Sequence, residues 1–577
     1  MREIALRLPR TRLGELASEQ FKDMALGGQF WLTAFTLLAA LLLGGGTRSG
    51  FLSDALLQLL AIPLLLLSAS RLGDLFWRHR AKLRQVRAEL IFCLALVLVP
   101  LIQLVPLPPA LWTLLPHRGP LIASFDGLGQ GLGHGLPWLP ISVSPNATWL
   151  SVVALLPTLA VFFGTVLLGY RERRLLSLAV VAFGIVSAFL GLLQIAQGPA
   201  SRLRFFAATN LTEAVGFFAN RNHFAAFLYV VLLFAAVWAI DIGSAVGPWR
   251  DRRIFEARSI VTITASFLAI VILLAAEAMA RSRAGMMLTM ISLAGVYGLV
   301  LTDRRRRNLS ATPLNFLFVA AGTAFILVVQ FALYRVLARF NTDPLDDARL
   351  QFARTTIEAA WAYMPFGAGM GTFVPVYGMF ERPQDLFAHA YVNHAHDDIL
   401  ELCLETGIFG LTLMVAFVAW FVSRAARIWR RASVRGNEFD RSLARAATIA
   451  VALIVTHSFL DYPLRTAAMT AILAFACGLM VETLGADDRA KQRQVRASRD
   501  TAMQGAAPRA TAVSVTVASP PAIAPDQEPA PSHDPPRPRP ARWGDGVEWP
   551  EAWRGPGTGL KKTSGPAPTL PPDADKK

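Results

Sequence analysis

Charged residues are scarce in this sequence, and cysteines are scarcer still. Only 17% of the 577 residues are charged, whereas a soluble chain of this size carries about 25%. The three cysteines, Cys93, Cys403 and Cys477, each lie in or beside an apolar run, and none has the spacing of a metal site. The low charge excludes an ordinary soluble multidomain protein, and the cysteines predict neither a disulfide framework nor a zinc site.

Hydrophobic residues take the place of the missing charge. They make up 54% of the chain and gather in long runs, and a helix of about 20 apolar residues crosses the hydrocarbon layer of a bilayer. The sequence therefore predicts an all-α fold, a polytopic membrane helical bundle with about 12 transmembrane helices. The predicted spans lie near residues 29–46, 52–69, 90–107, 147–169, 175–195, 223–241, 259–279, 284–301, 313–334, 404–423, 443–461 and 466–483.

The positive charge of the chain lies between these apolar runs. The net charge is +16, but Lys and Arg form no single patch, which argues against nucleic acid as a partner. They concentrate in every second connection, including Arg71–Arg87, Arg250–Arg258 and Arg424–Arg445. By the positive-inside rule these connections face the cytoplasm, so we expect both termini to be cytoplasmic.

The chain divides into three parts by composition. Residues 1–28 form a cytoplasmic N-terminal segment before an uncleaved first span, since no short apolar stretch with a cleavage site follows. Residues 29–483 form the transmembrane domain. Residues 484–577 are rich in Pro, Ala and charge, which predicts a disordered cytoplasmic tail. The longest outer connection, about 335–403, is expected to be a large functional periplasmic loop with a helix over 345–363 and a turn at Pro365–Gly371.

Several arginines lie on the predicted outer side, against the positive-inside rule. A planar guanidinium group matches phosphate oxygens, so we interpret this set as an anion-binding surface. The alternatives are snorkelling at the interface or pairing with carboxylates. Glu277, an ionisable residue at membrane depth, is itself a functional candidate, although it could instead pair with Arg281 at i,i+4 spacing. The outer arginines are Arg202, Arg204, Arg221, Arg281, Arg283, Arg335, Arg339, Arg349, Arg354 and Arg382.

The densest polar cluster, residues 393–405, comes just before the tenth predicted span. Histidine exchanges a proton near neutral pH, so His394 and His396 are candidates for general acid or base chemistry. The acids Asp397, Asp398 and Glu401 could instead cap the following helix. A His-x-His metal site is the competing interpretation, and the spacing alone is a weak signal for it.

Five short motifs resemble those of the O-antigen ligase/polymerase family. His396-Asp397, nine residues and then Gly407-Ile408-Phe409-Gly410 resembles the family's histidine and Gly-x-x-Gly signature. The turn Pro365–Gly371 resembles its Pro-Leu-Phe-Gly-x-Gly-x-Gly stretch. The other three are Gly216–Phe224, Ser282–Gly285 and His457-Ser458-x-x-Asp461, and the order matches over roughly 140–483. Asp397 departs from the Asn, Ser or Gln usual in ligases, and the tail is not part of the family pattern.

The resemblance implies an enzyme of the bacterial inner membrane with a periplasmic active site. Its donor would be a glycan on undecaprenyl diphosphate. Its acceptor would be lipid A-core or a growing glycan, and membrane lipids would be further partners. His396 would be the general base, and Arg349, with Arg221 and Arg283, would bind the donor diphosphate. His394, Asp397, Asp461 and Asn222 would support them. No metal or other cofactor is implied, and single displacement would invert the anomeric carbon.

Other functions stay open at this point. Within the same chemistry, the acceptor could be a protein serine, as in a protein O-oligosaccharyltransferase. A lipid or sugar transporter would show inverted repeats and helices broken at the midplane, and neither is evident in the sequence. A purely structural scaffold would leave the outer arginines and histidines unexplained.

Overall fold

The computed structural model describes residues 26–48, 52–132, 136–246, 257–307, 322, 344–385, 392–430 and 438–484. These residues form helices joined by turns, and their only β-type pairing is an isolated bridge between Leu107 and Leu139. The all-α prediction is therefore confirmed for the described part of the chain. The predicted N-terminal segment, apart from its last residues, and the predicted tail lie outside it. The helices are α2 (Gly28–Leu43), α3 (Leu52–Arg78), α4 (Arg80–Arg84), α5 (Arg87–Gln103), α6 (Pro109–Trp112), α7 (Gly119–Leu132), α8 (Pro145–Leu167), α9 (Tyr170–Gln197), α10 (Arg221–Val246), α11 (Ala257–Ala280), α12 (Arg283–Arg307), α14 (Pro344–Tyr363), α15 (Phe373–Phe380), η2 (Pro383–Asp385), α16 (Asp398–Arg430), α17 (Glu438–His457), η3 (Pro463–Arg465) and α18 (Ala467–Met480).

Many of these helices suit a membrane. Among the described residues, seven helices are long and apolar enough to cross one, namely α3, α8, α9, α10, α11, α12 and α16, while α2 and α18 are shorter apolar helices. Every predicted span falls on a helix except 313–334, of which only residue 322 is described. The protein is thus a multi-pass helical membrane protein, and the count of about 12 spans remains a prediction.

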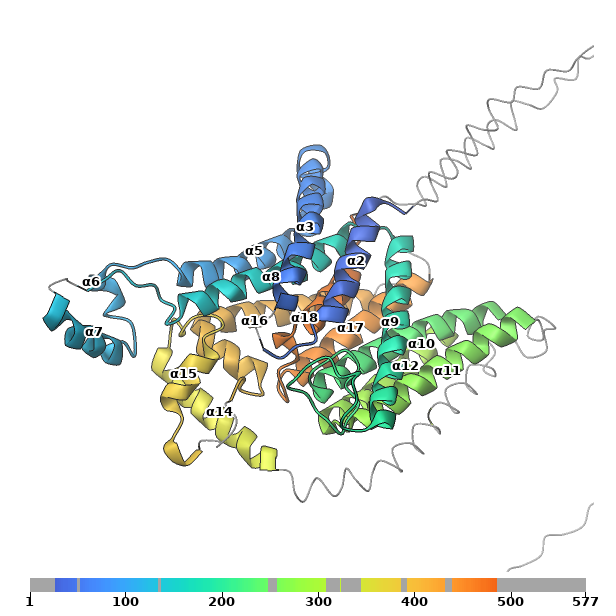
Figure 1. The fold of residues 1–577 in the computed structure, drawn as a ribbon. Helices are drawn as coiled ribbons and strands as arrows, with labels where there is room; N and C mark the ends of the chain where they lie inside the picture. Colours follow the sequence, from blue (N-terminus) through green and yellow to red (C-terminus); the bar gives the residue numbers. More distant parts are fainter. Residues whose placement is uncertain are drawn as a thin grey trace, which may run out of the picture. The chain divides into compact units, whose positions relative to one another are not determined.

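The bundle is organised around two helices, α10 and α8, that each pack against several others. Helix α10 packs against α9, α11, α12 and α17, and α8 packs against α2, α3, α5 and α18 (Figure 1). Helix α17 joins the two groups, because it contacts both α10 and α18. Side chains along α10 from Phe224 to Val237 are almost fully buried, as expected for a central helix that is apolar on all sides.

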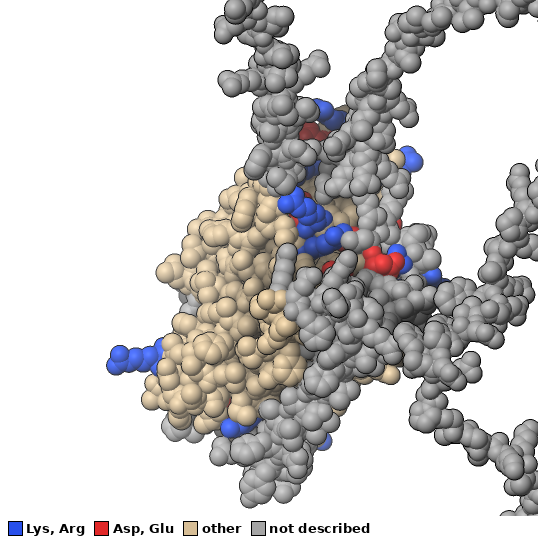
Figure 2. Space-filling model, turned by 90° about the vertical axis from the view of Figure 1, so that its right-hand side faces the viewer, with Lys and Arg blue, Asp and Glu red and all other residues tan. Residues whose placement is uncertain are grey.

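The outer faces of the bundle are apolar, which fits lipid as their surroundings. Figure 2 shows a broad uncharged area on the described part of one face, with charged side chains gathered beside it. A water-soluble helix would place polar residues there, because exposed apolar patches of this size are rare on soluble proteins. Exposed apolar side chains on the spanning helices include Leu59, Leu66, Val186, Phe189, Val261, Leu268, Val415 and Val422.

The predicted periplasmic loop forms a second, smaller core. Helix α14 covers the predicted helix at 345–363, and it packs with α15 against the first turns of α16. The cluster joins Phe352 and Tyr363 of α14, Phe373 and Tyr377 of α15, and Leu404 of α16. This packing holds the segment before α16, which carries His394 and His396, against the bundle.

Helices α16 and α17 run in succession, so the first residues of α16 and the last of α17 lie at the same end of the bundle. That end also contains the first turn of α10 and the segment between α17 and α18. We call it the histidine end, after His223, His394, His396 and His457. The opposite end, where α16 finishes and α17 begins, is called the arginine end, after Arg173, Arg174, Arg424 and Arg427.

Candidate functional site at the histidine end

The centre of the site is a hydrogen bond between His396 and Asp461. The His396 Nδ1 atom donates to Asp461 Oδ1 at 2.9 Å, and the Asp461 side chain is fully buried while that of His396 is 21% exposed. This bond fixes the imidazole tautomer and leaves Nε2 as the basic nitrogen. A carboxylate that orients a histidine and stabilises its protonated form is the arrangement that general-base catalysis needs.

Other groups hold Asp461 in its ionised form. Asn222, in the first turn of α10, donates its Nδ2 proton to Asp461 Oδ2. Burial alone would raise the pKa of Asp461, but the hydrogen bond and charge of His396, with the charges of His223 and Arg349, bring it well below its ordinary value. The carboxylate is therefore ionised at neutral pH, as a partner for a protonated His396 must be.

Tyr462 packs three of the four histidines against one aromatic ring. Its ring centroid lies 4.3 Å from that of His394, 4.8 Å from that of His396 and 4.8 Å from that of His223. The phenol is almost fully buried, and Asn220 Nδ2 approaches its hydroxyl at 3.5 Å. Tyr462 was not among the residues that the sequence singled out, because a lone tyrosine after an aspartate gives no signal of such packing.

Two buried histidines at this end have unused hydrogen-bonding capacity. Both ring nitrogens of His223 and the Nε2 atom of His457 are buried without a hydrogen-bond partner among the described residues. His457 Nδ1 lies 3.2 Å from the Tyr229 hydroxyl. Buried polar atoms without partners are costly, so these nitrogens mark a place where a polar ligand or water fits.

The backbone at His396 is strained. Its φ angle is +54°, in the left-handed region that residues other than glycine seldom adopt. Glu401 holds the preceding residues in place, because its carboxylate accepts hydrogen bonds from the Ala395 backbone N–H at 3.1 Å and from His394 Nδ1 at 3.0 Å. His394 Nε2 also donates to the Thr47 carbonyl at 3.0 Å.

Both nitrogens of His394 therefore face acceptors, and only the imidazolium form can donate to both. Burial alone would lower the pKa of His394, but the Glu401 carboxylate outweighs it, and the pKa lies above its ordinary value. His394 is thus a charged anchor of the loop, whereas His396 carries the basic nitrogen.

Three acids on one face of α16 surround Arg465. Arg465 Nη1 lies 2.7 Å from Glu405 Oε2, and its Nε lies 3.4 Å from Glu401 Oε1 and 3.6 Å from Asp398 Oδ1. Burial opposes the charge of Arg465, but the three carboxylates raise its pKa above the ordinary value. Asp397 acts differently, since its Oδ1 accepts the N–H groups of Ile399 and Leu400 and so caps α16. The capping expectation is confirmed for Asp397, while Asp398 and Glu401 form ion pairs.

The two glycine motifs lie against each other. Gly407 interrupts α16 with φ +56° and ψ −140°, and Ile408 N donates to the Pro365 carbonyl at 3.0 Å. In the turn, the Ala368 N–H donates to the Leu404 carbonyl at 2.9 Å, and the Gly369 N–H donates to the Glu405 carbonyl at 2.9 Å. A Cβ atom at Gly407 would collide with the Pro365 carbonyl oxygen. The predicted turn at Pro365–Gly371 is confirmed, and its contact with the Gly-x-x-Gly segment fixes the position of the helix that follows His396.

The predicted arginines differ in their surroundings. Arg349, in α14, lies close enough to Asp461 and His457 to lower the pKa of Asp461, and its buried Nε has no hydrogen-bond partner among the described residues. Arg221 instead donates to Glu213 at 3.1 Å, and Arg283 begins α12. No hydrogen bond joins Arg221 or Arg283 to His396 in the described part of the chain.

Glu277 does not pair with Arg281, so the alternative that their i,i+4 spacing allowed is not formed among the described residues. Arg281 has φ +52° and directs Nη1 to the Thr212 carbonyl at 3.3 Å. The Glu277 carboxyl is buried in α11, and neither oxygen has a hydrogen-bond partner among the described residues. The left-handed backbone at Arg281 turns its side chain away from the face that i,i+4 spacing would give it.

A cavity of about 770 Å³ reaches the site from within the bundle. It lies between α3, α5, α8, α16 and α18, and most of its wall is apolar, as at Leu57, Leu155 and Phe417. Thr47, His394 and Arg465 line it at the histidine end, and Glu89 and Trp420 line it toward the other end. The described residues contain no group of three or more His, Cys, Asp or Glu side chains placed to hold a metal ion.

One known family matches part of the chain. Residues 268–415 match the model of a family described as O-antigen ligase. This match supports the resemblance to the O-antigen ligase/polymerase family over that stretch of the chain. A domain of this family implies a membrane enzyme of the glycosyltransferase or ligase type. No curated protein matches the chain. The stretch of the O-antigen ligase match includes Arg349, His394 and His396. Asp461, which contacts His396, and Asn222, which contacts Asp461, lie outside it.

Proposed function

We propose that this protein transfers or polymerises glycan from an undecaprenyl-diphosphate-linked donor to an acceptor hydroxyl at the periplasmic face. The observation that carries the proposal is the His396–Asp461 pair, a partly exposed imidazole on a buried carboxylate, at the end of a membrane helix bundle. A hydroxyl that attacks an anomeric carbon needs a base, and a histidine oriented by an aspartate provides one.

In the proposed reaction His396 Nε2 removes the proton from the acceptor hydroxyl. The hydroxyl oxygen forms a bond to the anomeric carbon as the bond from that carbon to the diphosphate oxygen breaks, so the configuration inverts. The proton remains on His396, and Asp461 stabilises the imidazolium through Nδ1. Undecaprenyl diphosphate then leaves with the electron pair of the broken bond.

Arg349 is the residue we assign to the departing diphosphate. Its guanidinium group lies near Asp461, and a buried Nε without a partner among the described residues supports a ligand in this position. Fixed guanidinium groups can stabilise developing phosphate charge without a metal ion. Arg221 and Arg283 are proposed to assist, with Arg221 exchanging part of its contact with Glu213 for the ligand. His394 and Asn222 are proposed to support the base and its partner, as the sequence suggested, and Asp397 to act only indirectly, by capping α16.

The large apolar cavity supports a lipid-linked substrate. Its walls suit an isoprenoid chain, and its polar end lies beside His394 and Arg465, next to the proposed reaction centre. A donor with a long hydrocarbon tail could bind with its tail among α3, α5, α8, α16 and α18 while its diphosphate faces the histidine end. A water-soluble sugar nucleotide would gain nothing from such a cavity.

Glycan analysis in a deletion strain tests the proposal. The strain carries either the wild-type protein or His396→Ala, and the lipopolysaccharide, exopolysaccharide and lipid-linked glycans are compared on gels. Long chains that accumulate on the lipid carrier, with bare lipid A-core, would identify a ligase with lipid A-core as acceptor. Single repeat units without long chains would identify a polymerase. Near-normal glycan in every fraction with His396→Ala would contradict the assigned base.

A further inference from the structure

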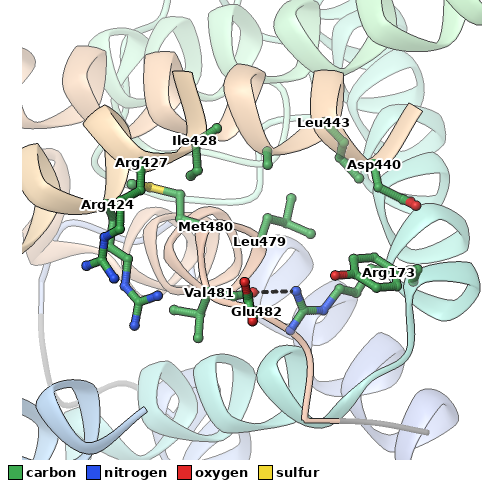
Figure 3. A pocket seen from close by; sticks show the side chains of 12 residues that line it. Arg173, Arg424, Arg427, Ile428, Asp440, Leu443, Leu479, Met480, Val481 and Glu482 are labelled. Atoms are coloured by element: carbon green, nitrogen blue, oxygen red, sulfur yellow. Dashed lines mark hydrogen bonds between the residues drawn. The ribbon is translucent and has the colours of Figure 1, made fainter. Parts of the chain in front are cut away.

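A second pocket lies at the arginine end, remote from the proposed reaction centre. It is formed between α9, α16, α17 and α18, and three arginines line it, Arg173, Arg424 and Arg427. Figure 3 shows Arg424 and Arg427 on one side, Arg173 on the other, and Val481 and Glu482 between them. From its first to its last residue α16 has 33 residues, so this pocket lies a membrane thickness away from His396.

Arg173 forms a rigid wall of the pocket. Its side chain is buried and donates to three backbone carbonyls: Thr165 at 2.9 Å, Val166 at 3.1 Å and Val481 at 2.8 Å. These carbonyls belong to the last turn of α8 and to the residue after α18, where helix ends leave acceptors without an intrahelical partner. The guanidinium group therefore fixes the ends of α8 and α18 relative to α9 and holds the pocket open.

The other arginines provide the charge of the pocket. Arg424 contacts Glu89 and donates to the Gln85 carbonyl at 3.1 Å, but its Nε is buried without a partner among the described residues. Arg427 is exposed at the rim, where Nη2 lies 3.0 Å from the Ser423 hydroxyl. Three arginines and two carboxylates, Asp440 and Glu482, line the pocket, an excess of one positive charge. Arg174 and Glu89, which pair with Asp440 and Arg424 from outside the lining, add one charge of each sign and leave this excess unchanged.

The remaining wall is apolar and points to an amphiphile. Ile428, Leu443, Ala444, Leu479 and Met480 line the inner part of the pocket, next to its charged rim. Its volume is about 70 Å³, and since 10–15 Å³ by the same measure holds about one water, a phosphate group fits. From this combination we infer that the pocket binds the phosphodiester headgroup of an anionic phospholipid, with the acyl chains along α16 and α18.

A lipid headgroup matches the pocket better than a soluble phosphate does. The pocket lies at the ends of membrane-spanning helices, at the level where lipid phosphates lie, and basic pockets between transmembrane helices bind such headgroups. A phosphodiester carries one negative charge, which balances the one excess positive charge. The apolar inner wall would contribute nothing to the binding of free phosphate, whereas an acyl chain buries it.

Lipid binding by the purified full-length chain tests the inference. Wild-type protein, Arg427→Gln, Arg427→Lys and the control Arg78→Gln, at the end of α3, are mixed with phosphatidylglycerol or phosphatidylcholine. Retained lipid is counted by native mass spectrometry. We expect wild type, Arg427→Lys and Arg78→Gln to retain phosphatidylglycerol in preference to phosphatidylcholine, and Arg427→Gln to bind it about tenfold more weakly.

Three results would overturn the inference. Arg427→Gln could retain phosphatidylglycerol as tightly as Arg78→Gln does. Inorganic phosphate could displace the lipid at equal concentration, which would identify a soluble ligand. Binding by the wild-type protein could be unchanged in about 0.5 M sodium chloride, although salt screens an exposed ionic contact. The salt measurement needs no variant, so it decides the matter even if Arg427→Gln loses its fold.

Discussion

Both ends of the bundle contain buried carboxylates, but these carboxylates have different partners. At the histidine end, buried Asp461 is hydrogen-bonded by His396 and Asn222. At the arginine end, buried Asp440 is held by both Arg174 Nε and Nη2 at 2.6 Å, and Glu89 is held by Arg424. A guanidinium group keeps its proton at any physiological pH, whereas an imidazole can release one. The first arrangement suits proton transfer, and the second suits fixed structure and anion binding.

The ends also differ in backbone strain. His396 has a positive φ angle, and Gly407 breaks the helix that follows it. At the arginine end, none of the described residues that line the pocket has a positive φ angle. Strain of this kind persists only where surrounding contacts hold it, and it collects at functional sites. The Glu401 carboxylate, bound to Ala395 and His394, is the contact that holds it here.

The substitution Asp461→Asn is expected to have the largest effect, and this effect is a loss of catalytic rate. The neutral amide cannot stabilise a protonated His396 and could favour the wrong imidazole tautomer, so we expect glycan transfer to fall about 10²- to 10⁴-fold. The rate of transfer per folded molecule measures this. Asp397→Asn is the matched control, because asparagine caps a helix as well as aspartate does. Equal losses of glycan transfer in the two variants would contradict the assignment of Asp461 as the partner of the base and of Asp397 as a helix cap.

A smaller effect is expected on stability from Gly407→Ala. The new Cβ atom meets the Pro365 carbonyl oxygen, and alanine resists a φ of +56°, so we expect a loss on the order of 1–3 kcal/mol. Thermal unfolding in detergent measures the change. Gly378→Ala, in α15, is the control, since a Cβ atom added there would meet nothing within 4 Å. Similar melting temperatures for the two variants would show that the kink is not needed.

Much of the fold could be predicted from the sequence, because long apolar runs leave few alternatives to membrane helices. The predicted starts of α8, α10 and α12 agree closely with the observed ones, while α10 and α12 continue beyond their predicted ends. The site was predictable only in part. His396, Asp461 and Asn222 were chosen, but their contacts depend on the packing of α17 against both α10 and α16, which no local pattern encodes. Tyr462 and the anchoring role of Glu401 were missed for the same reason.

At the arginine end, Asp440→Asn should affect stability and not catalysis. The Asp440 carboxylate is 4% exposed but the Arg174 side chain is 28% exposed, so water screens part of the pair, and we expect a loss of about 1–2 kcal/mol. Glycan transfer per folded molecule should stay at the wild-type level. A loss of transfer comparable to that of Asp461→Asn would contradict the division between the two ends.

The smallest expected effect is a pH dependence from His394. Because its pKa is raised in the folded protein, its contribution to stability is complete below the ordinary value of 6.5 and is lost as the pH rises through the folded value. Glu401 and Arg465 are the charged groups that face it. Melting temperatures between about pH 6 and pH 9 should fall more in wild type than in His394→Gln. Parallel curves would show that His394 is not held as an imidazolium.

The most direct test of the central claim is the transfer rate of purified His396→Ala beside His117→Ala. Both histidines have positive φ angles, but His117 is exposed and packs against Tyr363 and Phe380, away from Asp461. With a lipid-diphosphate-linked glycan as donor, we predict that His396→Ala loses about 10²-fold or more of the rate and His117→Ala keeps it. A His396→Ala enzyme that transfers glycan as fast as His117→Ala would contradict the assignment of His396 as the base.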